Sequence, residues 1–104
     1  MIKSEDLIKI TSYFSIIAHS PGRLRVRVNP QIEKESKNIS IKDIEDLPKK
    51  ISGIKEIKIN KIIASITIKY DPQIFKPKLW EDLINHRNIE EVLVLINNLA
   101  KEAL

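Results

Sequence analysis

The strict alternation of basic and apolar residues over 23–28 constrains the fold more than any other feature of the chain. Successive side chains of a strand point to opposite faces of a sheet, so a period of two indicates a strand buried on one side. Leu24, Val26 and Val28 then face the core, and three arginines face solvent: Arg23, Arg25 and Arg27. The sequence therefore predicts a sheet with one open, basic face.

The segment just before this strand also has an extended pattern. Residues 15–19 also look extended, and Pro21-Gly22 separates them from residues 23–28. Such a pair forms either a turn between two strands or a bulge inside one long, bent strand. The sequence leaves both arrangements open.

A proline interrupts the first clear helical pattern. Ile41, Ile44, Leu47 and Ile51 recur at steps of three and four, which places them on one face of a helix. Pro48 lies within this pattern, and a proline in a helix interior costs roughly 3 kcal/mol. We expect a bent or two-piece helix over about 41–52, which Gly53 ends.

The next two apolar segments predict a β-hairpin. Residues 54–60 and 62–70 both have strand composition, and only a short turn near Asn60-Lys61 separates them. The inward set of the second strand is Ile62, Ala64, Ile66, Ile68 and Tyr70.

The C-terminal third of the chain predicts helices, with one ambiguity. Residues 78–85 read as a helix, and apolar residues recur at helical spacing from Ile89 to Ala100. The run over 91–96 nevertheless has the composition of a strand. We favour a helix for 89–103, and a closing strand is the alternative.

These elements, in order, predict an α+β fold. Strand, helix, strand, strand, helix and then a strand or helix is the ferredoxin-like βαββα(β/α) order, with an antiparallel sheet and helices on one face. The 104 residues suit one domain, 1–104, in which 86–104 form the C-terminal helix or the closing strand.

Composition limits the chemistry and the compartment. The chain has no cysteine, which excludes disulfides and thiolate-bound metals. Its net charge of +4 permits acidic partners without requiring them. The first six residues are acidic where an export signal would be basic, and no apolar segment is long enough to span a bilayer. We expect a cytoplasmic, soluble protein.

Three segments carry a resemblance to a known family. His19–Val28 with its His-x-Pro-Gly-Arg motif, Ile51–Ile57 and Ala64–Pro72 resemble a variant heavy-metal-associated domain, of the subgroup that lacks the Cys-x-x-Cys loop. The resemblance covers residues 14–85 and implies the handling of a metal ion or metallocofactor. Polar residues replace the cysteines after Val28, so soft-metal transfer between thiolates is excluded.

His19 is the candidate metal or haem ligand. A neutral imidazole suits zinc, copper or haem iron, and the turn at Pro21-Gly22 is expected to expose it. One histidine does not make a tight zinc site, but one axial ligand can fix haem iron on an apolar surface. The alternative is that His19 only orients this turn. The other residues expected at the ligand surface are Tyr13, Pro21, Gly22, Arg23, Arg25, Arg27 and Tyr70.

The second histidine is not expected to join this site. In the assumed topology, His86 lies at the opposite end of the sheet from His19. We interpret it as a solvated residue at a helix end.

The function that follows is a non-enzymatic module that handles a metal or metallocofactor such as haem, as a carrier, sensor or trafficking domain. No catalytic motif is present. One alternative is a protein-interaction module in which residues 89–100 contact a second copy or another protein. Nucleic-acid binding by the three arginines is disfavoured, because the outward positions hold no aromatic residue to stack on bases.

Overall fold

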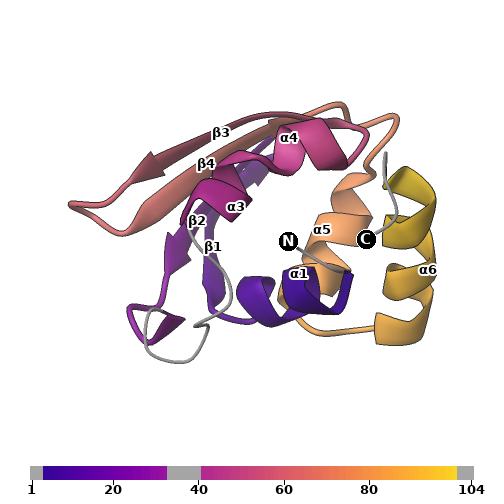
Figure 1. Ribbon diagram of the computed structural model, residues 1–104, viewed down its shortest axis with the longest axis horizontal. Coiled ribbons are helices and arrows are strands. Elements are labelled where there is room, and N and C mark those ends of the chain that lie inside the picture. The colour runs from indigo at the N-terminus through magenta and orange to yellow at the C-terminus, as the bar shows by residue number, and fades with distance from the viewer. Residues whose placement is uncertain (1–3, 33–40, 101–104) are drawn as a thin grey trace.

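A four-stranded antiparallel sheet with helices on one face forms the protein (Figure 1). The computed structural model describes residues 4–32 and 41–100. In space the strands follow the order β1 (Phe14–Ser20), β2 (Arg23–Val28), β4 (Ser65–Tyr70) and β3 (Ile54–Asn60). The helices are α1 (Ser4–Thr11), α3 (Ile41–Glu45), α4 (Leu47–Lys50), α5 (Pro77–Ile84) and α6 (Ile89–Leu99).

The strand connections confirm the predicted ferredoxin-like class. Both β2 and β3 pair antiparallel with β4, so they run parallel to each other with β4 between them. The chain crosses from β2 to β3 through α3 and α4, which is a split βαβ unit. The α3 and α4 segments pack on β3, and α5 packs on β1.

Pro21-Gly22 forms a turn, so β1 and β2 are two strands of a hairpin. Gly22 has a φ of 91°, a conformation that glycine adopts without steric cost. In the βαββαβ order, the strand at this edge comes from the C-terminus. Here β1 already occupies the edge, so the C-terminal segment is not needed to close the sheet.

The C-terminal segment is accordingly a helix. Residues Ile89–Leu99 form α6, which packs on α5 and α1. Val92 and Ile96 are buried against them. The favoured helix is therefore confirmed over 89–99, and a closing strand is wrong there. Residues 101–103 of the predicted helix lie outside the described part of the chain. None of the helices in the described part of the chain is long and apolar enough to cross a membrane.

The break at Pro48 is confirmed. Two short helices replace one long helix, and Pro48 lies in the first turn of the second, where its missing N–H costs nothing. Gly53 has a φ of 94° and precedes β3.

The turn of the second hairpin is longer than the sequence predicted. Residues 61–64 form the turn, and Ile62 is 95% exposed, so its predicted inward position is wrong. The cause is local: the Asn60 side-chain oxygen accepts hydrogen bonds from the backbone N–H groups of Ile62 and Ile63. Strand pairing then starts only at Ser65, and the inward positions at 66, 68 and 70 are confirmed.

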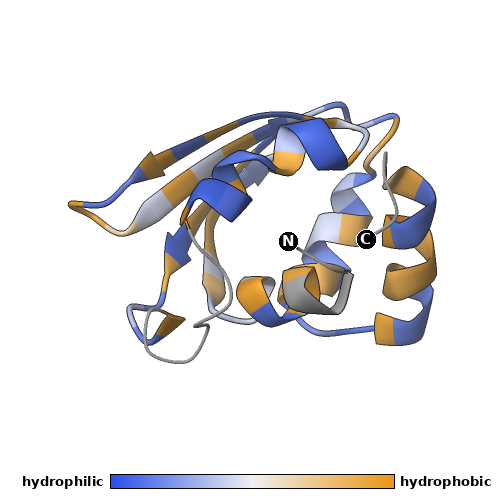
Figure 2. Ribbon diagram, viewed as in Figure 1, coloured by the Kyte–Doolittle hydropathy of each residue, from blue (hydrophilic) through white to orange (hydrophobic). Residues whose placement is uncertain are grey.

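The core lies between the sheet and the helix layer. Hydropathy alternates along the strands (Figure 2), and the apolar strand residues Leu24, Val26, Ile66 and Ile68 are buried in the core. An aromatic cluster fills the region beside α5: Phe75 and Trp80 stack with ring centroids 4.1 Å apart, and Tyr70 meets both edge-on. This cluster forms one wall of the site described next.

Candidate functional site

His19 lies near the end of β1, on the helix side of the sheet. It pairs across the hairpin with Leu24, which is fully buried, so both side chains point toward the helices. The His19 side chain is only 11% exposed. The expectation that the turn would expose it is therefore wrong, because its strand position directs the ring inward.

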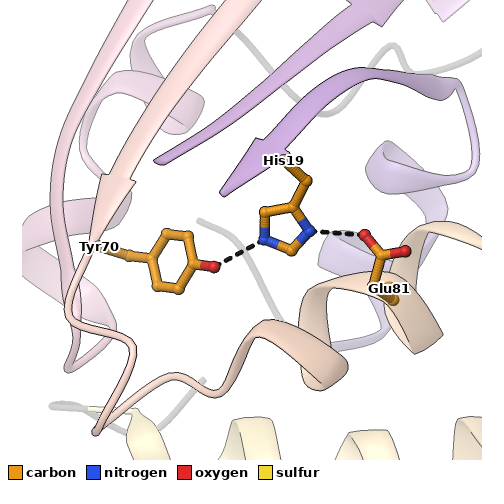
Figure 3. A network of polar contacts seen from close by, with 3 residues as sticks. All are labelled: His19, Tyr70 and Glu81. Atoms are coloured by element: carbon orange, nitrogen blue, oxygen red, sulfur yellow. Dashed lines mark hydrogen bonds and ion pairs between the residues drawn. The ribbon is translucent and has the colours of Figure 1, made fainter. Parts of the chain in front are cut away.

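Two side chains hold the imidazole (Figure 3). The Nδ1 atom of His19 lies 2.6 Å from the Glu81 carboxylate on α5. The Nε2 atom lies 2.6 Å from the hydroxyl of Tyr70 at the end of β4. The site thus joins two strands and a helix. Tyr70 is 51 positions and Glu81 is 62 positions from His19 in the sequence.

The protonation of Tyr70 gives the network a direction. Burial raises the pKa of the Tyr70 phenol above its usual value, and the negative charge of Glu81 raises it further; a backbone hydrogen bond from Gly22 opposes the rise. The protonated phenol can donate a hydrogen bond to Nε2 of His19. In the tautomer that accepts this bond, the Nδ1–H group donates a hydrogen bond to the Glu81 carboxylate. Glu81 thus orients the ring, and the Nε2 lone pair points at Tyr70.

This arrangement fits one kind of metal chemistry better than others. Ligating histidines commonly donate their second ring N–H to a carboxylate, which fixes the ring and makes it more basic. Among the described residues, no group of three or more His, Cys, Asp or Glu side chains could hold a metal ion. The donors therefore do not fit a closed zinc site. The imidazole can offer Nε2 as a single ligand atom only after its hydrogen bond to the Tyr70 hydroxyl is broken.

The structure brings together only part of the predicted ligand surface. Tyr70 joins His19 directly, and its backbone N–H donates to the Gly22 carbonyl at 3.0 Å, which places the Pro21-Gly22 turn beside them. Tyr13 precedes β1, at the opposite end of that strand from His19.

The three arginines do not reach this site. The residues at 23, 25 and 27 alternate with Leu24 and Val26, which are fully buried on the helix side. Their side chains therefore lie on the open face of the sheet, opposite His19.

The second histidine is separate, as expected. His86 is exposed in the turn between α5 and α6, where it has a φ of 57°. Both ring nitrogens of His19 are bonded to other residues, so the two histidines do not share a site.

Glu81 is the member of the site that sequence reasoning missed. It lies on the predicted helix 78–85 between Trp80 and Asp82, and no spacing connects it to His19. The one available signal was topological: a helix that follows β4 in this fold lies over the sheet, where a carboxylate in its middle can reach the neighbouring strand.

The family comparison agrees with the resemblance in the sequence. The family model described as heavy metal associated domain 2 matches residues 7–102, which is wider than the 14–85 recognised from the motifs. Comparison with curated proteins and with solved structures found no match.

Proposed function

Since this chain belongs to the heavy metal associated domain 2 family, we propose that it is a non-enzymatic module that handles metal as a metallocofactor, with haem as the first candidate. The atom that binds the metal is Nε2 of His19, and the module acts as a carrier, sensor or trafficking domain. The observation that carries the proposal is the hydrogen bond of 2.6 Å between Glu81 and Nδ1, which orients the ring and leaves Nε2 as the donor atom.

The choice of haem follows from the donor set. The chain has no thiolate, and the described residues hold no cluster of three ligands. A metal ion bound by one imidazole alone would dissociate readily, whereas a porphyrin gains affinity from apolar contact and needs only one axial ligand. Tyr70 lies next to His19, and its ring packs against Phe75 and Trp80. All three residues are at most 2% exposed, so a porphyrin would contact these rings only after the site opens.

Tyr70 has a defined part in this proposal. Its hydroxyl forms a hydrogen bond with Nε2 of His19, so it competes with the metal for the lone pair of this nitrogen. A net hydrogen-bond energy of about 0.5–1.5 kcal/mol corresponds to roughly 2- to 12-fold in affinity. Tyr70→Phe should therefore strengthen haem binding by about this factor.

The test is a haemin titration of the purified chain followed by the absorption spectrum. We expect a saturable Soret shift with one haem per chain that His19→Ala abolishes. The matched control is His86→Ala, which removes the exposed histidine and should bind as the wild type does. Circular dichroism confirms that each variant is folded.

Three results would contradict the proposal. One is the absence of a saturable shift, and another is a shift that His19→Ala leaves unchanged. The third is loss of binding in Tyr70→Phe with retention in His19→Ala, which would make the phenol the ligand.

A second candidate function is self-association through α6. Val94 is 59% exposed, Leu95 41% and Ile74 48%, and Leu95 and Ile74 line a groove of about 350 Å³ between α5 and α6. Lys76 and Glu91 line the same groove. In a twofold contact, the lysine of one copy can face the glutamate of the other, so a second copy is the occupant that the charges favour.

Sedimentation equilibrium without ligand distinguishes this candidate. A mass that rises with concentration, and that Leu95→Ser returns to the monomer value, would support it. A monomer at all concentrations would leave haem handling as the only proposal.

A further inference from the structure

The face of the sheet opposite the helices carries a row of three arginine side chains. Arg23 lies opposite Lys69 in the β2–β4 register, and Arg25 lies opposite Thr67. Among the described residues, Arg23, Arg25 and Arg27 form no ion pair. Alternate residues of a strand are roughly 7 Å apart, so the three guanidinium groups repel one another.

The acidic side chain on this face does not neutralise the arginines. Glu56 lies 3.7 Å from the Lys58 ammonium and 3.5 Å from that of Lys69. It is the only carboxylate among the described strand residues on this face. Within the described parts of the chain, 4–32 and 41–100, the arginines therefore have no carboxylate partner on this face, which favours an external anionic partner.

An exposed apolar tip adjoins these charges. Ile62 is 95% exposed and Ile63 is 47% exposed, in the turn between β3 and β4. This turn extends away from the helices, and its hydrophobic residues show clearly at the end of the hairpin (Figures 1 and 2). Ile62 lines the same groove of about 540 Å³ as Arg23 and Arg25, so tip and charges form one continuous surface.

We propose that this surface docks the protein on an anionic phospholipid bilayer. The arginines and Lys61 contact the lipid phosphates, and Ile62 and Ile63 enter the boundary between headgroups and acyl chains. Basic residues next to an exposed apolar tip are the combination that holds a protein at such an interface without spanning it. The inference does not depend on His19, which lies on the other side of the sheet.

Two features favour a bilayer over a nucleic acid. The open face carries no aromatic side chain among the described strand residues, so it offers no platform for base stacking. The exposed isoleucines gain no apolar contact from a phosphate backbone, whereas insertion into a bilayer removes their side chains from water.

The test is flotation of the purified full chain with vesicles. One set contains equal parts of phosphatidylcholine and phosphatidylglycerol, and the other contains phosphatidylcholine alone. We expect binding to the first set only, with a strong decrease at about 1 M salt, where charges are screened beyond about 3 Å. Each basic residue near an anionic surface contributes about fivefold in affinity, so Arg23→Gln/Arg25→Gln should weaken binding about 25-fold.

Matched variants separate this surface from net charge and general hydrophobicity. Lys49→Gln/Lys78→Gln removes the same charge from exposed helix positions and should bind nearly as the wild type does. Ile62→Ser should weaken binding on the order of tenfold, because burial of an isoleucine side chain stabilises by at least that factor. At concentrations where the chain is a monomer, Val94→Ser, which changes an exposed apolar residue on α6, should bind the vesicles as the wild type does.

Several outcomes would overturn the proposal. These are no binding to the anionic vesicles, equal binding to both vesicle sets, or equal losses in the two double variants. Binding that Ile62→Ser leaves unchanged would also overturn it. A parallel titration with single-stranded RNA and with duplex DNA tests the nucleic-acid alternative. If the protein binds either one more tightly than vesicles, and Ile62→Ser leaves that binding unchanged, the face binds nucleic acid.

Discussion

Replacement of Tyr70 by phenylalanine isolates one atom of the site. The hydroxyl lies 2.6 Å from His19 Nε2, and Tyr70 as a whole is 2% exposed. The phenylalanine ring keeps the edge-on contacts with Phe75 and Trp80. The substitution therefore removes the hydroxyl group and its hydrogen bond, and it leaves the packing of the ring unchanged.

The expected cost is about 1.5 kcal/mol in the free energy of unfolding. A buried polar group that loses its partner costs about 1–3 kcal/mol. The His19 side chain is 11% exposed, so a water molecule can partly replace the lost hydrogen bond to Nε2. The cost should therefore lie in the lower half of this range. For a domain of this size, the melting temperature should fall by roughly 6–12 °C.

The same variant tests the raised pKa of the phenol. Because folding raises this pKa, the unfolded chain releases the Tyr70 proton first, near pH 10, while the folded chain still holds it. Tyr70 therefore stabilises the wild type fully below about pH 10, and this contribution is lost as the pH rises toward the folded pKa. In that window the wild type should lose up to about 1.4 kcal/mol per pH unit more than Tyr70→Phe.

Urea unfolding followed by circular dichroism, between neutral pH and about pH 11, measures both effects. Tyr13→Phe serves as the matched tyrosine control. A double-mutant cycle with His19→Ala should give a coupling energy of about 1 kcal/mol between positions 19 and 70. Coupling near zero together with equal alkaline slopes would refute the network of hydrogen bonds described here.

Two further predictions concern the fold. Gly53→Ala should cost about 2–4 kcal/mol, because a φ of 94° strains any L-residue and the added Cβ would lie 3.0 Å from Phe75 Cβ. Gly22→Ala should cost only about 1–2 kcal/mol, since its nearest contact is 3.3 Å, and equal urea midpoints for the two variants would contradict this reasoning. Ile96→Ala should cost about 2–5 kcal/mol if α6 packs as described, whereas Val94→Ala should change the stability by less than about 0.5 kcal/mol. The reverse order in thermal unfolding would place the helix on its other face.

The sequence determined the features that depend on neighbouring residues. Alternation over 23–28 established the strand, its buried face and its basic face. Pro48 divided the helix, because the loss of one N–H and the clash of its ring act within a single turn. The spacing of apolar residues over 89–100 was also helical, although its composition left a strand open.

Only the tertiary structure decided the features that depend on distant segments. Because β1 occupies the edge of the sheet, the C-terminal segment packs on α5 and α1 and does not pair with β2, and no local pattern contains that placement. The side of the sheet on which His19 lies followed from its pairing with Leu24, and its partners came from positions 51 and 62 residues away. Side-chain periodicity records which face of its own element a residue occupies. The residues that meet it there are set by how the elements pack, which short-range spacing does not encode.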